Sequence, residues 1–366
     1  MNITHYRLAH IDTPLHTPFK TAVRTVDSLN DLVVMLETDT GHVGFGSAPS
    51  TPLITGDTHA TITSVIQSHL FPAVNGAAIA DIQNNCARLQ KAIMGHPSAK
   101  AAVEIALYDL WAQQQKLPLY KALGGTQRRL KTDYTISVNP LDEMMNDCRS
   151  ALDKGYDCLK IKIGNDFSQD IDRIISIYNA FHQHATLRLD VNQGWTIEQS
   201  LQAVQILEKQ AARFELIEQP VRYDQIEDLA VVTARSSIPV MADESASSVR
   251  DVRLILTTGA ADIINIKLMK CGGLSQAIDI ARMSAEKQKT CMMGCMLEGS
   301  ISVAAAAHFA AAFSDQVPLI DLDGPTLGQF DPLRVGRLKD VNASTLFDKS
   351  LIELNDAPGL GILAIK

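Results

Sequence analysis

Between about residue 132 and residue 323, eight short apolar runs alternate with amphipathic helical stretches. Two parallel strands need a crossover connection, usually a helix, so this alternation predicts a parallel sheet and an α/β fold. Eight strand and helix units of this size favour a closed (β/α) barrel over a doubly wound open sheet. The eight runs are TDYTISV, YDCLKIKIG, TLRLDVN, FELIEQP, IPVMADE, ADIINIKL, TCMMGCM and PLIDLD.

Charged residues recur near the ends of these runs, about one strand and helix unit apart. From Asp190, the chain reaches Glu218 after 28 residues, Asp243 after another 25 and Lys267 after another 24. The carboxyl ends of barrel strands converge at one mouth, where the active sites of such barrels lie. The sequence therefore predicts an active site whose charged residues are Lys160, Lys162, Asp190, Glu218, Asp243, Lys267, Asp321 and Asp323.

The alternation of residues along each strand predicts that these charges point inward. In LKIKI, the apolar residues share one face, which must pack beneath the helices, and Lys160 and Lys162 share the other face. The same argument places Asp190 and Lys267 on the inner face of their strands. Inward charges are costly unless they are paired or bind a metal, so their repetition indicates a functional site.

Three of the acids, Asp190, Glu218 and Asp243, stand at consecutive strand ends. One such residue alone is as readily a helix N-cap or a solvated loop charge, but three in succession favour a shared ligand. Hard oxygen donors without histidine or cysteine suit Mg²⁺, or Mn²⁺, rather than zinc. The pattern predicts a divalent metal flanked by two lysine bases.

The remainder of the chain predicts a second structural unit. Residues 1–125 mix strand-like segments with the helical patterns of residues 59–74 and 98–115, and they form an α+β domain in this interpretation. Ser98 is the expected N-cap of the second helix. The barrel occupies residues 126–325, and residues 326–366, which resemble loop and short strand, are expected to return to the first domain.

The composition excludes several classes of function. A formal net charge of −8, a pI near 5.7 and the lack of any Lys/Arg run argue against a nucleic-acid partner. The sequence has no run of eighteen uncharged apolar residues and no signal-peptide pattern, which predicts a cytoplasmic protein without membrane contact. Six dispersed cysteines indicate free thiols in a reducing compartment.

Six strings, LKIKIG, LDVNQGW, LIEQP, MADES, INIKLMKCGG and DLDGP, resemble the enolase superfamily in its muconate-lactonizing branch, and within it the dipeptide epimerases. The resemblance extends over nearly the whole chain, including PFKTAVRTV and ITGDT near the start. It implies a modified (β/α)7β barrel with an N-terminal capping domain, and a homo-oligomer. It also implies a dipeptide substrate, with the peptidoglycan-derived L-Ala-D/L-Glu pair as the leading expectation.

The resemblance implies roles for the residues around the reacting carbon. Asp190, Glu218 and Asp243 would bind one Mg²⁺. Lys162 and Lys267 would be the acid/base pair, one on each side of the substrate α-carbon.

It also implies how the substrate is held. Asp321 and Asp323 would bind the free α-ammonium group of a dipeptide. Arg24 would meet the side-chain carboxylate of a C-terminal glutamate. Lys160 and Thr135 are expected beside the substrate, and Asn192 and Asn265 in the layer behind the ligands and bases.

The residue types suit a two-base epimerisation. Removal of a proton α to a carboxylate gives an enediolate, whose charge a divalent cation stabilises. A lysine base must be neutral, although free lysine titrates near 10.4. A neighbouring cation disfavours the ammonium form, so Lys160 beside Lys162 is expected to lower the pKa of the base. Two opposed bases then give 1,1-proton transfer through the enediolate.

Several alternatives remain open at the level of sequence. A cycloisomerase or o-succinylbenzoate synthase of the same superfamily would share the metal and the lysines, and an epimerase of another dipeptide class would share the Asp321 and Asp323 pair as well. A Schiff-base aldolase on the same barrel, or a binding protein, would differ in class. The DLD string could simply end its strand, and Ser47 in GFGSAPS stands where the resemblance leads us to expect an acidic residue.

Overall fold

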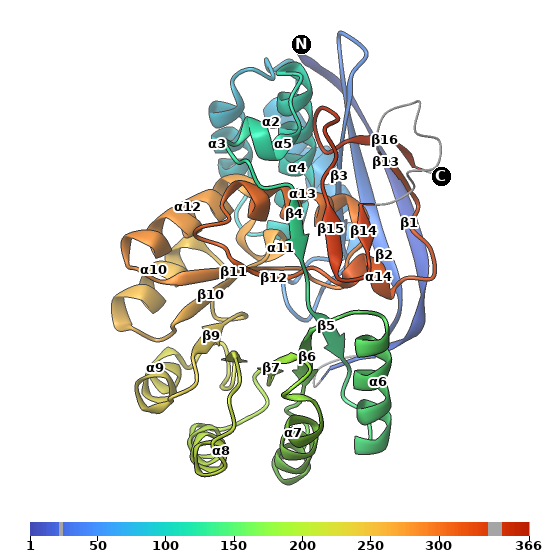
Figure 1. Cartoon of the computed structure of the whole chain (residues 1–366). Coiled ribbons are helices and arrows are strands. Elements are labelled where there is room, and N and C mark those ends of the chain that lie inside the picture. Colours follow the sequence, from blue (N-terminus) through green and yellow to red (C-terminus); the bar gives the residue numbers. More distant parts are fainter. Residues whose placement is uncertain (22–24, 336–345, 366) are drawn as a thin grey trace.

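The computed structural model describes residues 1–21, 25–335 and 346–365 (Figure 1). In these ranges the N-terminal part contains an antiparallel sheet of three strands in the order β1-β2-β3. Long-range pairs such as Leu8 with Val34 set the register between the first two strands. The strands are β1 (Ile3–Lys20), β2 (Thr25–Thr38) and β3 (Val43–Pro49).

A layer of helices packs on this sheet, and the closest contact is between β3 and the long helix α4. A Cβ atom on Gly46 would lie 1.9 Å from the carbonyl oxygen of Ala102, so glycine permits the close approach of strand and helix. The helical elements are α1 (His59–Val65), η1 (Ile66–Leu70), α2 (Phe71–Val74), α3 (Ile82–Lys91), α4 (Pro97–Gln114) and α5 (Leu119–Ala122).

The expectation that Ser98 caps α4 is wrong. The helix begins at Pro97, and its N-cap is His96, whose φ is 53°. Proline is favoured in this first position because it has no N–H to leave unpaired. Ser98 lies inside the first turn, where its N–H donates to Asp57 Oδ2 at 3.0 Å.

The second part is a parallel barrel, as the alternation of strands and helices predicts. Across the described ranges, eight strands pair in strict sequence order from β5 to β12, and helices surround them (Figure 1). Between β12 and β5 no ladder forms in these ranges, but Leu322 N donates to Thr132 Oγ1 at 2.7 Å. The barrel is therefore nearly closed, and the expected fold class is confirmed.

The bounds of the barrel elements follow the expected runs. The strands are β5 (Tyr134–Ile136), β6 (Cys158–Lys162), β7 (Thr186–Asp190), β8 (Leu216–Glu218), β9 (Val240–Ala242), β10 (Ile263–Ile266), β11 (Thr290–Gly294) and β12 (Leu319–Asp321). The helices are α6 (Leu141–Asp153), α7 (Phe167–Phe181), α8 (Ile197–Lys209), α9 (Ile226–Arg235), α10 (Val249–Thr258), α11 (Leu268–Cys271), α12 (Leu274–Glu286) and α13 (Ser300–Ala312).

The C-terminal segment contacts helices of the N-terminal part. Leu119 N donates to Gly359 O at 2.8 Å, and Leu360 N donates to Asp109 Oδ1 at 2.8 Å. We propose a domain boundary near residue 125, with the described parts of residues 326–366 belonging to the capping side. The elements of this segment and its partner are β4 (Arg129–Lys131), α14 (Gly324–Leu327), β13 (Leu333–Val335), β14 (Phe347–Asp348), β15 (Leu351–Glu353) and β16 (Ile362–Ile365).

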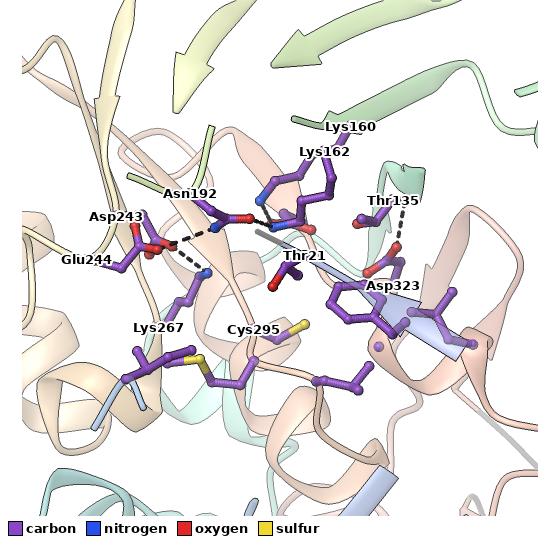
Figure 2. A pocket seen from close by; sticks show the side chains of 17 residues that line it. Thr21, Thr135, Lys160, Lys162, Asn192, Asp243, Glu244, Lys267, Cys295 and Asp323 are labelled. Atoms are coloured by element: carbon purple, nitrogen blue, oxygen red, sulfur yellow. Dashed lines mark hydrogen bonds and ion pairs between the residues drawn. The ribbon is translucent and has the colours of Figure 1, made fainter. Parts of the chain in front are cut away.

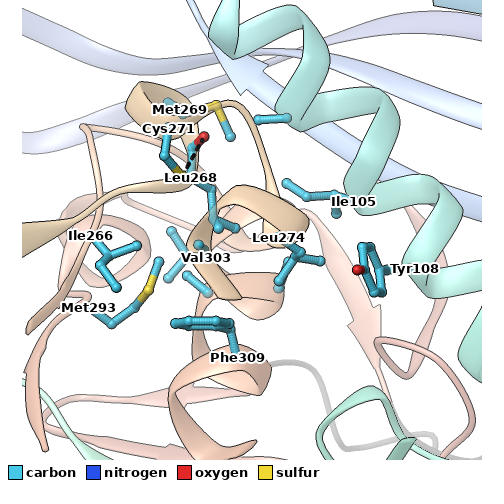
Figure 3. Close-up of a cluster of buried hydrophobic side chains, with 14 of the residues drawn as sticks. Ile105, Tyr108, Ile266, Leu268, Met269, Cys271, Leu274, Met293, Val303 and Phe309 are labelled. Carbon is cyan, nitrogen blue, oxygen red and sulfur yellow. Dashed lines mark hydrogen bonds between the residues drawn. The ribbon is translucent and has the colours of Figure 1, made fainter. Parts of the chain in front are cut away.

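One hydrophobic cluster spans both parts of the molecule. Ile105 and Tyr108 of α4 lie beside Leu274 of α12, and Val303 and Phe309 of α13 continue the cluster beneath them (Figure 3). Burial of such side chains favours the folded state by about 1.5–3 kcal/mol each. The shared core fixes the capping part over the β10 to β12 side of the barrel. Within the described ranges, none of the helices has the length and apolarity that a membrane span requires.

Candidate active site

A cavity of about 60 Å³ opens at the carboxyl ends of the barrel strands (Figure 2). Strand order explains why distant residues meet there, since every strand of a parallel barrel points to the same mouth. Phe19, Thr21 and Ile54 of the N-terminal part also line the cavity. The expected site residues that line it are Thr135, Lys160, Lys162, Asn192, Asp243, Lys267, Asp321 and Asp323.

Lys160 is a buried cation at the centre of the barrel mouth. Its Nζ lies 3.0 Å from Asp190 Oδ2, 2.6 Å from Glu218 Oε2 and 2.7 Å from Asp321 Oδ2. Burial lowers the pKa of Lys160, but these carboxylates outweigh burial and hold the pKa well above its ordinary value. Lys160 therefore carries an ammonium group. This is the charge state expected for the cation beside the base.

Lys162 and Lys267 approach the cavity from different sides (Figure 2). Lys162 ends β6 and Lys267 follows β10, and three strands separate β6 from β10 in the barrel. Lys162 Nζ lies 2.5 Å from Asp190 Oδ2, and Lys267 Nζ lies 2.8 Å from Asp243 Oδ2. Two amines thus face the same space from opposed walls.

The pKa of Lys267 does not fall in this arrangement. Burial lowers the pKa, but the Asp243 carboxylate outweighs burial, and the net direction is upward. A base must be neutral to accept a proton. A cation bound to the carboxylates would weaken their stabilisation of the ammonium form of Lys267 and so favour the neutral amine.

The three expected metal ligands end neighbouring strands. Asp190 of β7 is in register with Glu218 of β8, and Asp243 directly follows β9. All three are buried. As the described side chains lie, no three His, Cys, Asp or Glu residues surround one point closely enough to hold a metal ion. The ammonium groups of Lys160 and Lys267 stand against these carboxylates instead.

The chemistry of the trio nevertheless fits a divalent cation. Glu218 Oε2 is buried and accepts no hydrogen bond, although Lys160 Nζ lies 2.6 Å away outside hydrogen-bond geometry. Burial and then the neighbouring Asp190 charge raise the pKa of Glu218 to about 8. The donors are all carboxylate oxygens, which suits Mg²⁺. A cation among them would relieve the unfavourable burial of negative charge.

Asp321 and Asp323 have different partners. Asp321 pairs with Lys160, whereas Asp323 Oδ2 accepts a hydrogen bond from Thr135 N at 2.7 Å. Burial and then the Asp321 charge raise the pKa of Asp323 to about 6. Within the described part of the chain no basic side chain pairs with Asp323, so it can accept a hydrogen bond from a cationic group in the cavity.

The two expected asparagines lie at different depths: Asn192 lines the cavity itself, whereas Asn265 does not line it. Asn192 Oδ1 accepts from Lys162 Nζ at 3.0 Å, and Asn265 Nδ2 donates to Glu218 Oε1 at 3.0 Å. Arg24 falls outside the described residues, so its predicted contact with a substrate side chain stays a prediction.

Ser47 donates from Oγ to Asp31 Oδ2 at 3.2 Å. The acidic group expected at position 47 is thus present nearby, but it comes from β2. Asp31 Oδ2 also accepts the N–H of Gly299, which follows the cavity wall formed by Met296 and Leu297. The serine therefore belongs to a polar contact between the capping sheet and the barrel.

The sequence patterns did not predict two residues of the site, Lys270 and Glu244. Lys270 Nζ lies 2.5 Å from Asp243 Oδ1 and also donates to Asp243 O. Glu244 lines the cavity and accepts from Asn192 Nδ2 at 3.3 Å. The available signals were the second lysine of KLMKC and the second acid of MADES, but either residue could equally have faced solvent.

Known families and structures match the chain over its full length. Residues 143–364 match the profile described as enolase C-terminal domain-like, and residues 3–124 match the mandelate racemase/muconate lactonizing enzyme N-terminal domain. The L-Ala-D/L-Glu epimerase of Clostridium acetobutylicum is 46% identical over 98% of each chain.

Solved structures support the same assignment. A substrate-liganded complex of the Bacillus subtilis L-Ala-D/L-Glu epimerase has a TM-score of 0.95 and 40% identity, with both chains fully covered. The Enterococcus faecalis dipeptide epimerase, complexed with Mg and L-Leu-L-Tyr, has a TM-score of 0.93 and 35% identity, again with both chains fully covered. The family expected from the sequence motifs is confirmed, and the chain belongs to the mandelate racemase/muconate lactonizing enzyme family of the enolase superfamily.

Proposed function

We propose that this protein is a dipeptide epimerase that inverts the α-carbon of the C-terminal residue, with L-Ala-L-Glu and L-Ala-D-Glu as its substrate pair. The observation that carries the proposal is the pair of opposed amines, Lys162 and Lys267, in a cavity that also holds Asp323. Relatives named as L-Ala-D/L-Glu epimerases, 46% and 41% identical, support the choice of substrate.

The site residues divide the reaction between two faces of the substrate. The neutral amine of one lysine takes the α-proton, and the ammonium group of the other gives a proton to the opposite face. Lys160 stays cationic beside these bases. The substrate's N-terminal ammonium group donates to Asp323, which distinguishes this reaction from that of a cycloisomerase.

Asp190, Glu218 and Asp243 are the residues that would hold Mg²⁺. When bound, the ion supplies positive charge to the reacting carboxylate and to the three acids around it. Related dipeptide epimerase structures are complexed with Mg, which supports this metal. Mn²⁺, a homo-oligomer and a cytoplasmic location stay predictions from the sequence.

Deuterium exchange tests the reaction directly. L-Ala-L-Glu incubated with the enzyme and MgCl₂ in D₂O is expected to gain one deuterium at the glutamate α-carbon and to become a mixture of two epimers. Proton NMR measures both changes. Removal of metal with EDTA should stop the exchange, and exchange at the alanine α-carbon would contradict the proposed orientation of the dipeptide.

Substitution of each base tests the two-base arrangement. Lys162→Ala and Lys267→Ala should each lower epimerisation by about 10²–10⁴-fold, because each face loses its proton carrier. Each variant should still exchange the α-proton of the one epimer that faces the remaining lysine. Lys209→Ala, at an exposed position on α8, is the control and should match the wild type. Near-wild-type turnover in either base variant would remove that lysine from the mechanism.

A further inference from the structure

A second cavity of about 400 Å³ adjoins the active site. The two cavities share three wall residues, Phe19, Thr135 and Leu327. The other walls of the second cavity are formed by residues 16–18 and Lys20 of β1 and by helix α6. The small reaction cavity and a space several times larger therefore meet at these three residues.

The shared wall lies at the ammonium end of the reaction cavity. Thr135 and Asp323 stand at one end in Figure 2, and Asp243, Glu244 and Lys267 stand at the other. With the reacting carbon between the two lysines and the ammonium group at Asp323, the N-terminal residue of the substrate lies against Thr135. This placement rests on the proposed function.

We propose that the second cavity receives the side chain of the substrate's N-terminal residue. The reaction cavity is much the smaller of the two, at about 60 Å³ against about 400 Å³, so a large first side chain is expected to extend into the second cavity. The adjoining space can hold a side chain of glutamine length. The enzyme should accordingly accept dipeptides whose first residue is much larger than alanine.

The walls of the second cavity indicate a polar, uncharged side chain. They carry the hydrogen-bonding groups of Ser137, Asn139, Asn146 and Ser150. Ser137 and Asn139 accept hydrogen bonds from Lys20, and Asn146 accepts one from Arg149, while the exposed Asn146 and Ser150 also meet water. An apolar side chain would displace this water without replacing its hydrogen bonds, which costs binding energy.

The charged groups of the lining are balanced in sign. Two carboxylates, Glu143 and Asp147, face this space with two lysines. Lys20 Nζ donates to Asn139 Oδ1 at 3.0 Å, and Lys154 Nζ lies 5.6 Å from the centre of the Tyr134 ring. Because neither sign of charge dominates, the lining favours a neutral side chain over a charged one.

A series of three dipeptides tests the chemistry of the cavity. L-Gln-L-Glu and L-Met-L-Glu have first side chains of similar length but different polarity, and L-Ala-L-Glu is the reference. Relative kcat/KM for L-Gln-L-Glu should equal or exceed that for L-Ala-L-Glu, and L-Met-L-Glu should fall roughly tenfold below L-Gln-L-Glu. Equal values for the glutamine and methionine substrates would overturn the polar assignment.

A cavity-filling variant tests the location. Ser150→Trp places a large ring in the second cavity, away from every residue that holds the reacting groups. Its kcat/KM for L-Gln-L-Glu should fall about tenfold or more, while that for L-Ala-L-Glu stays within about twofold. Asp153→Trp is the matched control, because Asp153 is exposed on the same helix and does not line the cavity.

The outcomes separate this inference from the proposed function. If the wild type epimerises L-Ala-L-Glu but Ser150→Trp handles L-Gln-L-Glu as the wild type does, the side chain lies elsewhere and only the inference fails. If the wild type epimerises none of the three dipeptides, the proposed function fails and the inference fails with it.

Discussion

Two lysines three residues apart hold the carboxylate of Asp243. Lys267 contacts Oδ2 at 2.8 Å and Lys270 contacts Oδ1 at 2.5 Å. Burial raises the pKa of Asp243, but the two lysines outweigh burial and hold it well below its usual range. Lys270 also donates to the carbonyl oxygens of Asp243 and Asn265, so all three of its protons have acceptors. Its part is to keep Asp243 ionised and oriented beside Lys267, the proposed base.

Replacement of Lys270 should therefore be far more costly than replacement of an ordinary buried lysine. Lys270→Met is expected to lower the free energy of unfolding by about 3–5 kcal/mol in EDTA, because it leaves Asp243 buried with one partner fewer. Urea unfolding measures the change.

Lys100→Met is the matched control for Lys270. Lys100 is buried on α4 and donates to Gln90 O, and it forms no ion pair in the described ranges. Its loss should cost about 1 kcal/mol. Equal losses in the two variants would show that Lys270 does not stabilise Asp243 electrostatically.

At the scale of elements, the loops after β6 and β7 pack directly on each other. Gly164 has a φ of 110°, and its N–H donates to Asp170 Oδ2 at 2.8 Å. The same oxygen accepts from Trp195 Nε1 at 3.1 Å. These loops follow Lys162 and Asp190 by two to five residues. Their packing therefore fixes the strand ends that carry a proposed base and a proposed metal ligand.

Gly164→Ala should disturb this packing, because its Cβ would lie 2.1 Å from Val191 O. We expect it to lower the free energy of unfolding by about 2–4 kcal/mol and to reduce kcat for L-Ala-L-Glu.

Gly155→Ala isolates the steric part of the effect. Gly155 has a φ of 89°, but a Cβ atom there would have nothing within 4 Å, so the substitution should cost only about 1 kcal/mol. Similar losses would assign the effect to backbone conformation alone.

At the scale of the whole molecule, buried carboxyl groups join the capping sheet to the barrel. Asp31 of β2 accepts the N–H of Gly299, and Glu104 of α4 accepts both the N–H and the hydroxyl of Ser275 at 2.7 Å. Burial raises the pKa of Asp31 to about 6 and that of Glu298, beside it, to about 7. The protonation of Asp31 and Glu298 therefore affects the stability of the contact between the capping sheet and the barrel.

These raised pKa values predict how stability depends on pH. Between the ordinary carboxyl pKa, near 4, and the folded value, the native state binds more protons than the unfolded chain. The stabilising contribution of Asp31 is thus fully present below pH 4 and is lost as pH rises through 6. Urea unfolding at pH 4.5 and at pH 7.5 gives the change in free energy of unfolding between the two pH values. Asp31→Asn should make this change smaller than in the wild type by on the order of 2 kcal/mol.

An exposed carboxylate of the same sheet provides the control. Asp12→Asn, on β1, should leave the pH dependence of unfolding as in the wild type. An unchanged pH dependence in Asp31→Asn would mean that folding does not raise the pKa of Asp31.

Much of the site followed from local patterns. Alternation of apolar and charged residues was enough to predict that Lys160, Lys162 and Asp190 point inward. Regular spacing was enough to predict that Glu218 and Asp243 lie at the same mouth of the barrel. Both inferences succeed because side chains alternate along any strand and the ends of parallel strands converge in any barrel. The motif strings then identified the family.

The partners of these residues could not be read from the chain. Lys160 reaches carboxylates on three other strands, Asp31 crosses from the capping sheet to Gly299, and a large cavity opens beside Thr135. Such contacts depend on the order of strands around the barrel and on where the capping part sits over it. Side chains far apart in sequence meet there, and no periodicity along the chain encodes that meeting.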